Sequence, residues 1–316
     1  MRRTLLVVIA LLAVLVALPS GAGAKKATYT LGVSDQQAST FTNPLFRPLK
    51  FKAARFITPW DVLSSRNDRS QLNAWLFGAR LAHQNILVSF EHSHRGKRAK
   101  KLPSVKAYTA MLKKFKKAYP FVREISPWNE VNRQIHSIGG GQFQGQPTWR
   151  NPKRVAQYYM AARKVYKGRT IVGVDLLDQL NVGPTLTYLR KFLRFAHPDP
   201  KVIGLHNYSD TNRFSTLRTR AVLRTFRGKV WLTETGGIVK LGRSFRRNTR
   251  RAAKALGCMF SLAKSNHRIQ RLYVYQFNAP LNPRTASFDA GLINPNQTRR
   301  LGYKVVQKRK ARRCHA

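Results

Sequence analysis

Eight times along the chain, a short run of β-branched or aromatic residues is followed by an amphipathic stretch with helical spacing. This alternation is typical of repeated βα units, in which helices join parallel strands. We therefore expect an α/β chain with eight parallel strands. The runs with strand character are Tyr29–Val33, Ala54–Ile57, Ile86–Phe90, Val122–Ser126, Thr170–Val174, Val202–Leu205, Lys229–Thr233 and Arg271–Gln276.

The stretches between these runs have the signals of helices. Asn151 before Pro152 is a typical helix start, because the Asn side chain caps free backbone N–H groups and Pro suits the first turn. The first connection, from Ser34 to Lys52, is less regular and is expected to hold only a turn of helix around Pro44–Leu49. The expected helices span residues 66–83, 104–118, 152–166, 184–195, 215–225 and 246–265, with a last one near 299–308.

Eight βα units close most naturally into a (β/α)8 TIM barrel. An open, doubly wound sheet is the alternative, but such a sheet usually has a glycine-rich turn after its first strand. Here the first strand leads into Gly32-Val33-Ser34-Asp35-Gln36, which is no phosphate-binding loop. The sequence thus predicts a TIM barrel.

The first 24 residues are typical of a secretory signal peptide. Met1-Arg2-Arg3 is followed by an apolar run from Leu5 to Leu18 and then by Ala22-Gly23-Ala24. The apolar run is shorter than the roughly 18 residues of a membrane span, although an uncleaved anchor is the alternative. We expect residues 1–24 to be removed and residues 25–316 to form one domain with a basic C-terminal tail. The protein is then secreted or associated with the cell envelope.

The charge of the chain is its most unusual compositional property. It has 59 Lys and Arg against 12 Asp and Glu, a formal net charge of +47 at pH 7. Such a surface attracts polyanions in a salt-dependent way. The charge reflects either a general surface bias or a specific partner, an anionic polymer of the wall or envelope. No nucleic acid is expected as a partner, because the chain is exported and its basic runs lack interleaved aromatic platforms.

Cys258 and Cys314 are the only cysteines. An even pair in an exported protein is a disulfide candidate, and this one would join a late helix to the C-terminal tail. Two free thiols are the alternative. No Cys/His cluster has the spacing of metal ligands, so neither a metal nor a cofactor is expected.

Polar residues gather where the strand runs end, and the C-terminal strand ends of a TIM barrel carry its functional residues. Two of the four glutamates stand out: Glu130 in Trp128-Asn129-Glu130-Val131-Asn132, and Glu234 in Trp231-Leu232-Thr233-Glu234-Thr235-Gly236-Gly237. Two glutamates facing each other across a barrel mouth are what a glycosidase needs. Other strand ends add Arg55, Trp60, His92, Asp175, Asp178, His206, Tyr208 and Phe277.

These segments resemble the clan A glycoside hydrolases, most closely the broad group around families 5 and 39 and related cellulase-like barrels. Nearly the whole chain after residue 24 is covered. The resemblance is carried by Thr58-Pro59-Trp60-Asp61, the segments around Glu130 and Glu234, and Phe288-Asp289-Ala290-Gly291-Leu292.

The resemblance implies a role for each matching residue. Glu130 takes the place of the general acid/base and Glu234 that of the nucleophile. Asn129 would hold the sugar 2-hydroxyl, and Tyr208 would touch the nucleophile. The chain departs from the pattern at Val131, where many members have Pro, and at Phe277, which stands where the eighth strand usually has Trp and still offers a flat apolar platform.

Elementary chemistry predicts how the two glutamates divide their roles. A retaining glycosidase needs two carboxyl groups about 5–5.5 Å apart, one ionised and one protonated. Arg55 is expected to keep Glu234 ionised by its opposite charge. The pKa of Glu130 is expected to rise through burial and the nearby negative charge.

We therefore expect a monomeric, secreted retaining hydrolase of poly- or oligosaccharides. Arg55, Trp60, His92, His206 and Phe277 are expected among its substrate-binding residues, and the amide-rich loop 133–150 is expected to form one wall of the cleft. A catalytically weak or inactive barrel that binds carbohydrate or an anionic wall polymer is the alternative.

Overall fold

The computed structural model describes residues 28–134, 136–138 and 142–314. The proposed signal peptide and the centre of the glycine-rich loop lie outside these residues. Within them, no helix is long and apolar enough to span a membrane.

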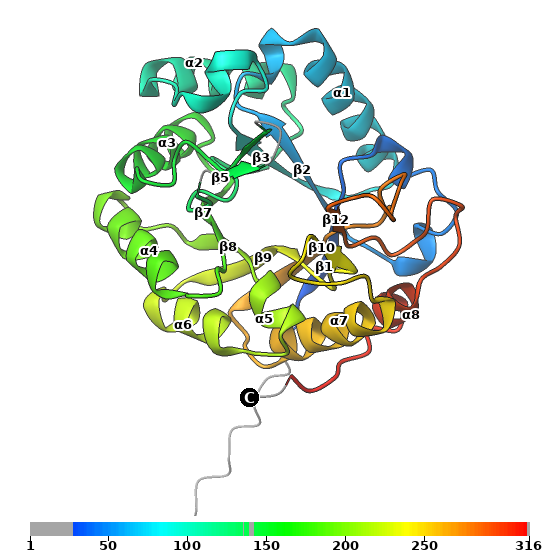
Figure 1. Cartoon of the computed structure of the whole chain (residues 1–316). Coiled ribbons are helices and arrows are strands. Elements are labelled where there is room, and N and C mark those ends of the chain that lie inside the picture. The colour runs from blue at the N-terminus through cyan, green and yellow to red at the C-terminus, as the bar shows by residue number, and fades with distance from the viewer. Residues whose placement is uncertain (1–27, 135, 139–141, 315–316) are drawn as a thin grey trace, which may run out of the picture.

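Eight strands form a closed barrel in the order β1-β11-β9-β8-β7-β4-β3-β2, and every neighbouring pair is parallel. The (β/α)8 TIM barrel predicted from the sequence is confirmed. Figure 1 looks along the barrel axis and shows the helices as an outer ring. The barrel strands are β1 Thr30–Ser34, β2 Ala53–Pro59, β3 Asn85–Glu91, β4 Glu124–Ser126, β7 Thr170–Leu177, β8 Val202–His206, β9 Lys229–Thr235 and β11 Ile269–Val274.

The helices of the ring follow the predicted order, with boundaries shifted by a few residues. The helix expected from residue 246 begins at Thr249, because the Asn248 side chain accepts from Arg251 N and caps it there. Asn151 caps its helix in the same way, as predicted. The helices are α1 Arg66–Leu81, α2 Val105–Ala118, α3 Pro152–Val165, α4 Gly183–Phe195, α6 Leu217–Thr225, α7 Thr249–Lys264 and α8 Leu301–Gln307.

Two strand boundaries differ more. The strand expected to begin at Val122 begins at Glu124, because Val122 N bonds to Tyr119 O in a turn. The eighth strand lies two residues earlier than expected and ends at Val274, which moves the residues after it out of the barrel wall.

Several short elements decorate the barrel. The loop after β1 holds the short 3-10 helices η1 Ala38–Thr40 and η2 Arg47–Leu49, the second within the expected range, and α5 Tyr208–Asn212 directly follows β8. Two small antiparallel pairs lie outside the barrel: β5 His136–Ile138 with β6 Gln142–Gln144, and β10 Lys240–Leu241 with β12 Phe288–Asp289. The remaining short helices are η3 Val62–Ser64 and η4 Gly96–Lys100.

The barrel interior is packed at its N-terminal end and polar at the other. One buried apolar cluster takes a residue from each of six barrel strands. Below it, Arg271 Nη2 donates to Glu124 Oε1 at 2.7 Å, which gives Glu124 the structural role of an ion-pair partner. Functional side chains are therefore left to the C-terminal end. The cluster consists of Ala53, Leu87, Val172, Val202, Trp231 and Tyr273.

The C-terminal tail is bonded to α7, one of the helices that surround the barrel. Cys258, in the middle of α7, forms a disulfide with Cys314, and their Cα atoms are 4.9 Å apart. Arg312 N also donates to Gly257 O. Both cysteines are buried, so the bridge closes over the outer face of α7.

Candidate active site

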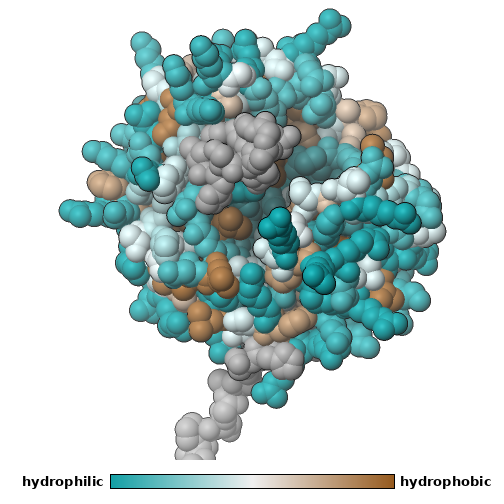
Figure 2. Space-filling model, viewed as in Figure 1, coloured by the Kyte–Doolittle hydropathy of each residue, from teal (hydrophilic) through white to brown (hydrophobic). Residues whose placement is uncertain are grey.

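Five charged or titratable side chains meet inside the C-terminal end of the barrel, each from a different strand. Since parallel strands bring their carboxyl ends to the same edge, residues far apart in sequence converge there. All five are buried. Figure 2 shows this face hollowed at its centre, within a largely hydrophilic surface. The five are Arg55 on β2, Glu130 after β4, Asp175 on β7, His206 at the end of β8 and Glu234 on β9.

The two glutamates are held close to each other by His206. Its Nδ1 lies 3.1 Å from Glu130 Oε1 and 3.6 Å from Glu234 Oε2. Ligand-type atoms of the three residues all lie within 4.8 Å of one another. One oxygen of each carboxylate thus lies within 4.8 Å of the other, which is compatible with the separation of about 5–5.5 Å used for attack by a carboxylate.

Arg55 organises the floor of the site. It is fully buried. Its guanidinium donates hydrogen bonds to groups from five other barrel segments, so that each of its three nitrogens has an acceptor. Asp175 and Glu234 raise its pKa although burial acts in the opposite direction. The five acceptors are Ser89 Oγ at 2.9 Å, Ser34 Oγ at 3.2 Å, Glu234 Oε1 at 2.6 Å, Asn129 Oδ1 at 2.6 Å and Asp175 Oδ2 at 2.9 Å.

His206 is charged at neutral pH. Burial alone would lower its pKa, but Glu234 and Asp175 outweigh burial and raise the pKa to about 10. Geometry agrees, because Nδ1 faces Glu130 and Nε2 faces Asp175 at 3.3 Å, so both ring nitrogens have an acceptor. Asp175 also accepts from Thr233 Oγ1, and its pKa is lowered against the effect of burial by His206 and Arg55.

Glu130 has an electrostatic environment that the sequence did not predict. Burial raises its pKa, as expected, but Arg133 and His206 outweigh burial and lower the pKa to about 2. Arg133 Nη1 donates to Glu130 Oε2 at 2.7 Å. The expectation of a raised pKa is therefore wrong for the free protein, because it left out the cation three residues further along. Glu130 also has a φ of 41°, a left-handed conformation that is uncommon for residues other than glycine.

Tyr208 and Asn129 border the two carboxylates. Tyr208, the first residue of α5, donates from its hydroxyl to Glu234 Oε2 at 3.0 Å. The turn that holds it is fixed by Asp178, whose carboxylate accepts from the backbone N–H groups of Ser209 and Asp210. Asn129 accepts from Arg55 through its side-chain oxygen, and its NH₂ group remains as a donor.

His92 and Trp60 lie further out on the same rim. His92 Nδ1 is 3.3 Å from Gln146 Oε1 and 3.7 Å from Glu91 Oε2. Trp60 is half-buried, and its indole N–H has no hydrogen-bond partner among the described residues. Both side chains are therefore partly exposed at the C-terminal end of the barrel.

The same fold is found in solved glycoside hydrolases. GH5_18 from Streptomyces cattleya, solved with GlcNAc, shares 15% identity over 90% of this chain and 80% of its own, with a TM-score of 0.63. Native xylanase 10B from Thermotoga maritima shares 12% identity over 91% and 97%, with a TM-score of 0.62. A family 39 glycoside hydrolase from Bacteroides cellulosilyticus WH2 shares 14% over 90% of this chain, which spans 64% of that protein, with a TM-score of 0.61.

This is the fold of the clan A glycoside hydrolases. The resemblance seen in the sequence is thereby confirmed at the level of the fold. No protein-family model matches the chain, and no curated protein matches it in sequence.

Three residues expected to bind substrate do not reach the surface of the barrel. Phe277 is fully buried and packs edge-on against Phe46, so it cannot serve as a sugar platform. The reason is the earlier end of β11, which turns Phe277 into the hydrophobic core. Arg55 and His206 are also fully buried, and each contacts a carboxylate of the cluster.

Tyr275 takes the place expected of Phe277. It is partly exposed and forms a cluster with two other rings: its ring centroid is 6.4 Å from that of Tyr208 and 5.8 Å from that of Phe288, and these two are 6.3 Å apart. The contact with Tyr208, which donates to Glu234 Oε2, places Tyr275 at the C-terminal end of the barrel. Burial and then Glu234 raise its pKa. Sequence reasoning also left Arg133 unassigned, although its spacing of three residues from Glu130 was a signal for a local ion pair.

Glu130, His206 and Glu234 are the described residues closest to a set of metal ligands. Two arginines already pair with this group, Arg55 with Glu234 and Arg133 with Glu130. Because its negative charge is balanced by these cations, we assign no metal to the cluster.

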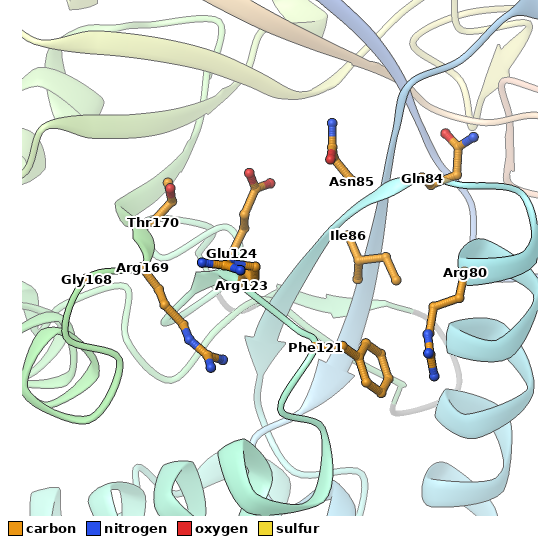
Figure 3. A pocket seen from close by; sticks show the side chains of 10 residues that line it. All are labelled: Arg80, Gln84, Asn85, Ile86, Phe121, Arg123, Glu124, Gly168, Arg169 and Thr170. Carbon is orange, nitrogen blue, oxygen red and sulfur yellow. The ribbon is translucent and has the colours of Figure 1, made fainter.

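A separate cavity of about 390 Å³ opens at the opposite end of the barrel. Figure 3 shows its lining side chains, which come from the C-terminal end of α1 and the N-terminal ends of β3, β4 and β7. Two of its cations are engaged in packing: Arg80 lies over the Phe121 ring, and Arg169 donates to Val122 O. This cavity is not part of the candidate active site.

Proposed function

We propose that the protein is a retaining glycoside hydrolase that cleaves O-glycosidic bonds of a poly- or oligosaccharide, with Glu234 as nucleophile and Glu130 as general acid/base. The observation that carries the proposal is the approach of these two carboxylates in the mouth of a clan A barrel, with His206 between them. Glutamates at the ends of the fourth and seventh barrel strands match the resemblance noted in the sequence.

The chemistry proceeds in two displacements. Glu234 attacks the anomeric carbon, the glycosidic C–O bond breaks, and Glu130 gives its proton to the departing oxygen. Glu130, now a carboxylate, takes a proton from water, and the water oxygen displaces Glu234 from the glycosyl-enzyme. Two inversions at one carbon retain the anomeric configuration, and both glutamates return to their starting states.

The surrounding residues support these steps. Arg55 and Tyr208 both donate to Glu234, which fixes the direction of its carboxylate and balances its charge. Asn129 is positioned by Arg55 to hold a sugar hydroxyl through its NH₂ group. Trp60 and Tyr275 supply partly exposed rings on which a sugar can stack.

Export from the cytoplasm belongs to the same proposal. It is supported by the signal-peptide composition of residues 1–24 and by the Cys258–Cys314 disulfide, since such bonds persist mainly in oxidising compartments. Residues 25–316 would be the mature domain.

A second candidate function is favoured by one observation. The Arg133–Glu130 ion pair opposes protonation of the proposed acid, as would be found in a barrel that binds glycans with little turnover. Such a protein would hold a glycan equally well with or without Glu234.

Hydrolysis of a glycan panel by purified protein tests the proposal. β-Glucans, xylans, mannans and acidic wall polymers would be compared for wild type and Glu234→Gln, with Glu124→Gln as the matched control at the other end of the barrel. We expect activity in wild type, a loss of about 10⁴-fold or more in Glu234→Gln, and activity in Glu124→Gln at a temperature where it is folded. NMR of the first product should show retained anomeric configuration. Hydrolysis that survives in Glu234→Gln would exclude the assignment.

A further inference from the structure

Arg133 connects the proposed acid to the opening of the site. Its guanidinium is 2.7 Å from Glu130 Oε2. The Arg133 side chain is 39% exposed, whereas that of Glu130 is 8% exposed. Arg133 therefore pairs through Nη1 with a buried carboxylate while more than a third of its own side chain stays exposed. A guanidinium has five donors in one plane, so it can pair with a second anion while still near the first.

The surface around the site is almost free of negative charge. Among the twelve acidic residues, all within the described chain, Asp199 alone is exposed, and it precedes β8 at the opposite end of the barrel. Glu91 is the acidic residue at the rim with some exposure, and it is bonded to His94 and Gln146.

Exposed cations surround the same opening. Residues 95–101, which follow β3, include five exposed Lys and Arg, and the segment after β9 adds Arg243, Arg246 and Arg247. A cleft whose rim carries positive charges and few negative ones raises the local concentration of anionic ligands and their association rate. A neutral glycan gains nothing from this arrangement.

Accepting the proposed function, we infer that the substrate is an acidic glycan, and that Arg133 binds a carboxylate carried by a sugar ring beside the scissile bond. A carboxylate is the group that an arginine fork pairs with in a two-point geometry. Arg133 is suited to this role because it is the cation that reaches both the cleft and the proposed acid.

The Arg133–Glu130 ion pair keeps the proposed acid deprotonated in the free protein, and a contact between Arg133 and a substrate carboxylate would reverse this effect. The charged groups that face Glu130 are Arg133 on its own segment, His206 from β8 and Glu234 from β9, with Arg55 and Asp175 behind them. A substrate carboxylate that draws Arg133 away removes one cation and adds a negative charge. Both changes raise the pKa of Glu130, so the acidic substrate itself prepares the proton donor. A neutral substrate leaves the ion pair intact.

The experiment compares one glycan in two forms, a uronate-bearing xylan and the same xylan after reduction of its carboxyl groups to alcohols. We expect wild type to prefer the carboxylated form by at least about tenfold in kcat/KM, the size of one charged hydrogen bond. Arg133→Gln should lower this ratio by about tenfold or more, whereas Arg133→Lys should restore part of it. Arg190→Gln, which removes an exposed charge from α4 in the outer helix ring, should leave the ratio within about twofold.

Several results would overturn the inference. They are a wild-type preference for the reduced xylan, an unchanged ratio in Arg133→Gln, or a preference for a sulfated over a carboxylated glycan. All assays use one ionic strength, because rim attraction is screened by salt.

Failure of the proposed function can be told apart from failure of this inference. If folded wild type cleaves none of these glycans, nor a neutral aryl glycoside, the hydrolase proposal is wrong. Binding then decides the role of Arg133: the carboxylated xylan should bind Glu234→Gln at least about tenfold more tightly than the reduced form. Equal binding of both forms, or a preference unchanged in the Arg133→Gln, Glu234→Gln double variant, would refute it.

Discussion

Arg55 Nη1 lies 2.6 Å from Glu234 Oε1, although 179 residues separate them in the chain. They sit on β2 and β9, which are not neighbours in the barrel, so the contact crosses its interior. A fully buried guanidinium is tolerated there because Asp175 balances its charge from a third strand. The ion pair therefore fixes the direction of the proposed nucleophile and joins distant parts of the barrel.

Arg55→Met should destabilise the fold strongly. Removing the guanidinium leaves the buried Asp175 and Glu234 without their cation, and breaking a buried ion pair in this way typically costs about 3–5 kcal/mol. The free energy of unfolding in urea measures the effect. Arg190→Met, on the exposed face of α4, should change it by less than about 0.5 kcal/mol. Similar losses in both variants would contradict the role of Arg55.

The sequence predicted the barrel well because its periodic pattern is a local property repeated eight times. Glu130 and Glu234 could be selected because carboxylates are rare in this chain and both follow strand runs. Side-chain direction at strand ends was harder to predict. Because β11 ends two residues earlier than expected, Tyr275 lies at the rim where Phe277 was expected. The low pKa of Glu130 was missed since it depends on the path of Arg133 beyond the strand, which no periodicity specifies.

Tyr208→Phe should slow turnover with little loss of stability. The variant removes a hydrogen bond of 3.0 Å to Glu234 Oε2, and bonds to charged groups contribute about 1.5–3 kcal/mol, or about 10- to 150-fold in rate. We expect the decrease mainly in kcat on an aryl glycoside. Tyr275→Phe keeps the stacking ring and should change KM more than kcat. An unchanged kcat in Tyr208→Phe would show that the hydroxyl does not act on the nucleophile.

Glu130→Ala should have an effect that depends on the leaving group. A dinitrophenolate leaves without a proton, so formation of the glycosyl-enzyme should persist, whereas cleavage of an alkyl glycoside should fall by about 10²–10⁴-fold, the range of general acid catalysis. Added azide, which needs no general base, should restore turnover of the dinitrophenyl substrate and yield a glycosyl azide. Equal losses on both substrates without azide rescue would remove Glu130 from the acid/base role.

Because of His206, the free energy of unfolding should fall as the pH rises into the alkaline range. Its pKa is raised from 6.5 to about 10 in the folded protein. The stabilisation is therefore fully present below the unfolded pKa of about 6.5 and is lost as pH rises through about 10. We expect the unfolding free energy of wild type to fall between these values and the fall to be much smaller in His206→Asn. His267→Asn, at an exposed position, should keep the wild-type slope. A flat wild-type profile would show that His206 is neutral.

Reduction of the Cys258–Cys314 disulfide should weaken the protein without altering the site. The bridge spans 56 residues and closes a loop that includes β11 and α8. In the chain-entropy model a loop of this length contributes about 4 kcal/mol by restricting the unfolded state. Urea unfolding with and without reductant measures the loss, and a Cys258→Ala, Cys314→Ala variant should be insensitive to reductant. Because neither cysteine contacts the glutamates, KM on an aryl glycoside should stay the same while the protein is folded. A change in KM at temperatures well below unfolding would mean that the tail positions the C-terminal end of β11, and with it Tyr275, as well as stabilising the fold.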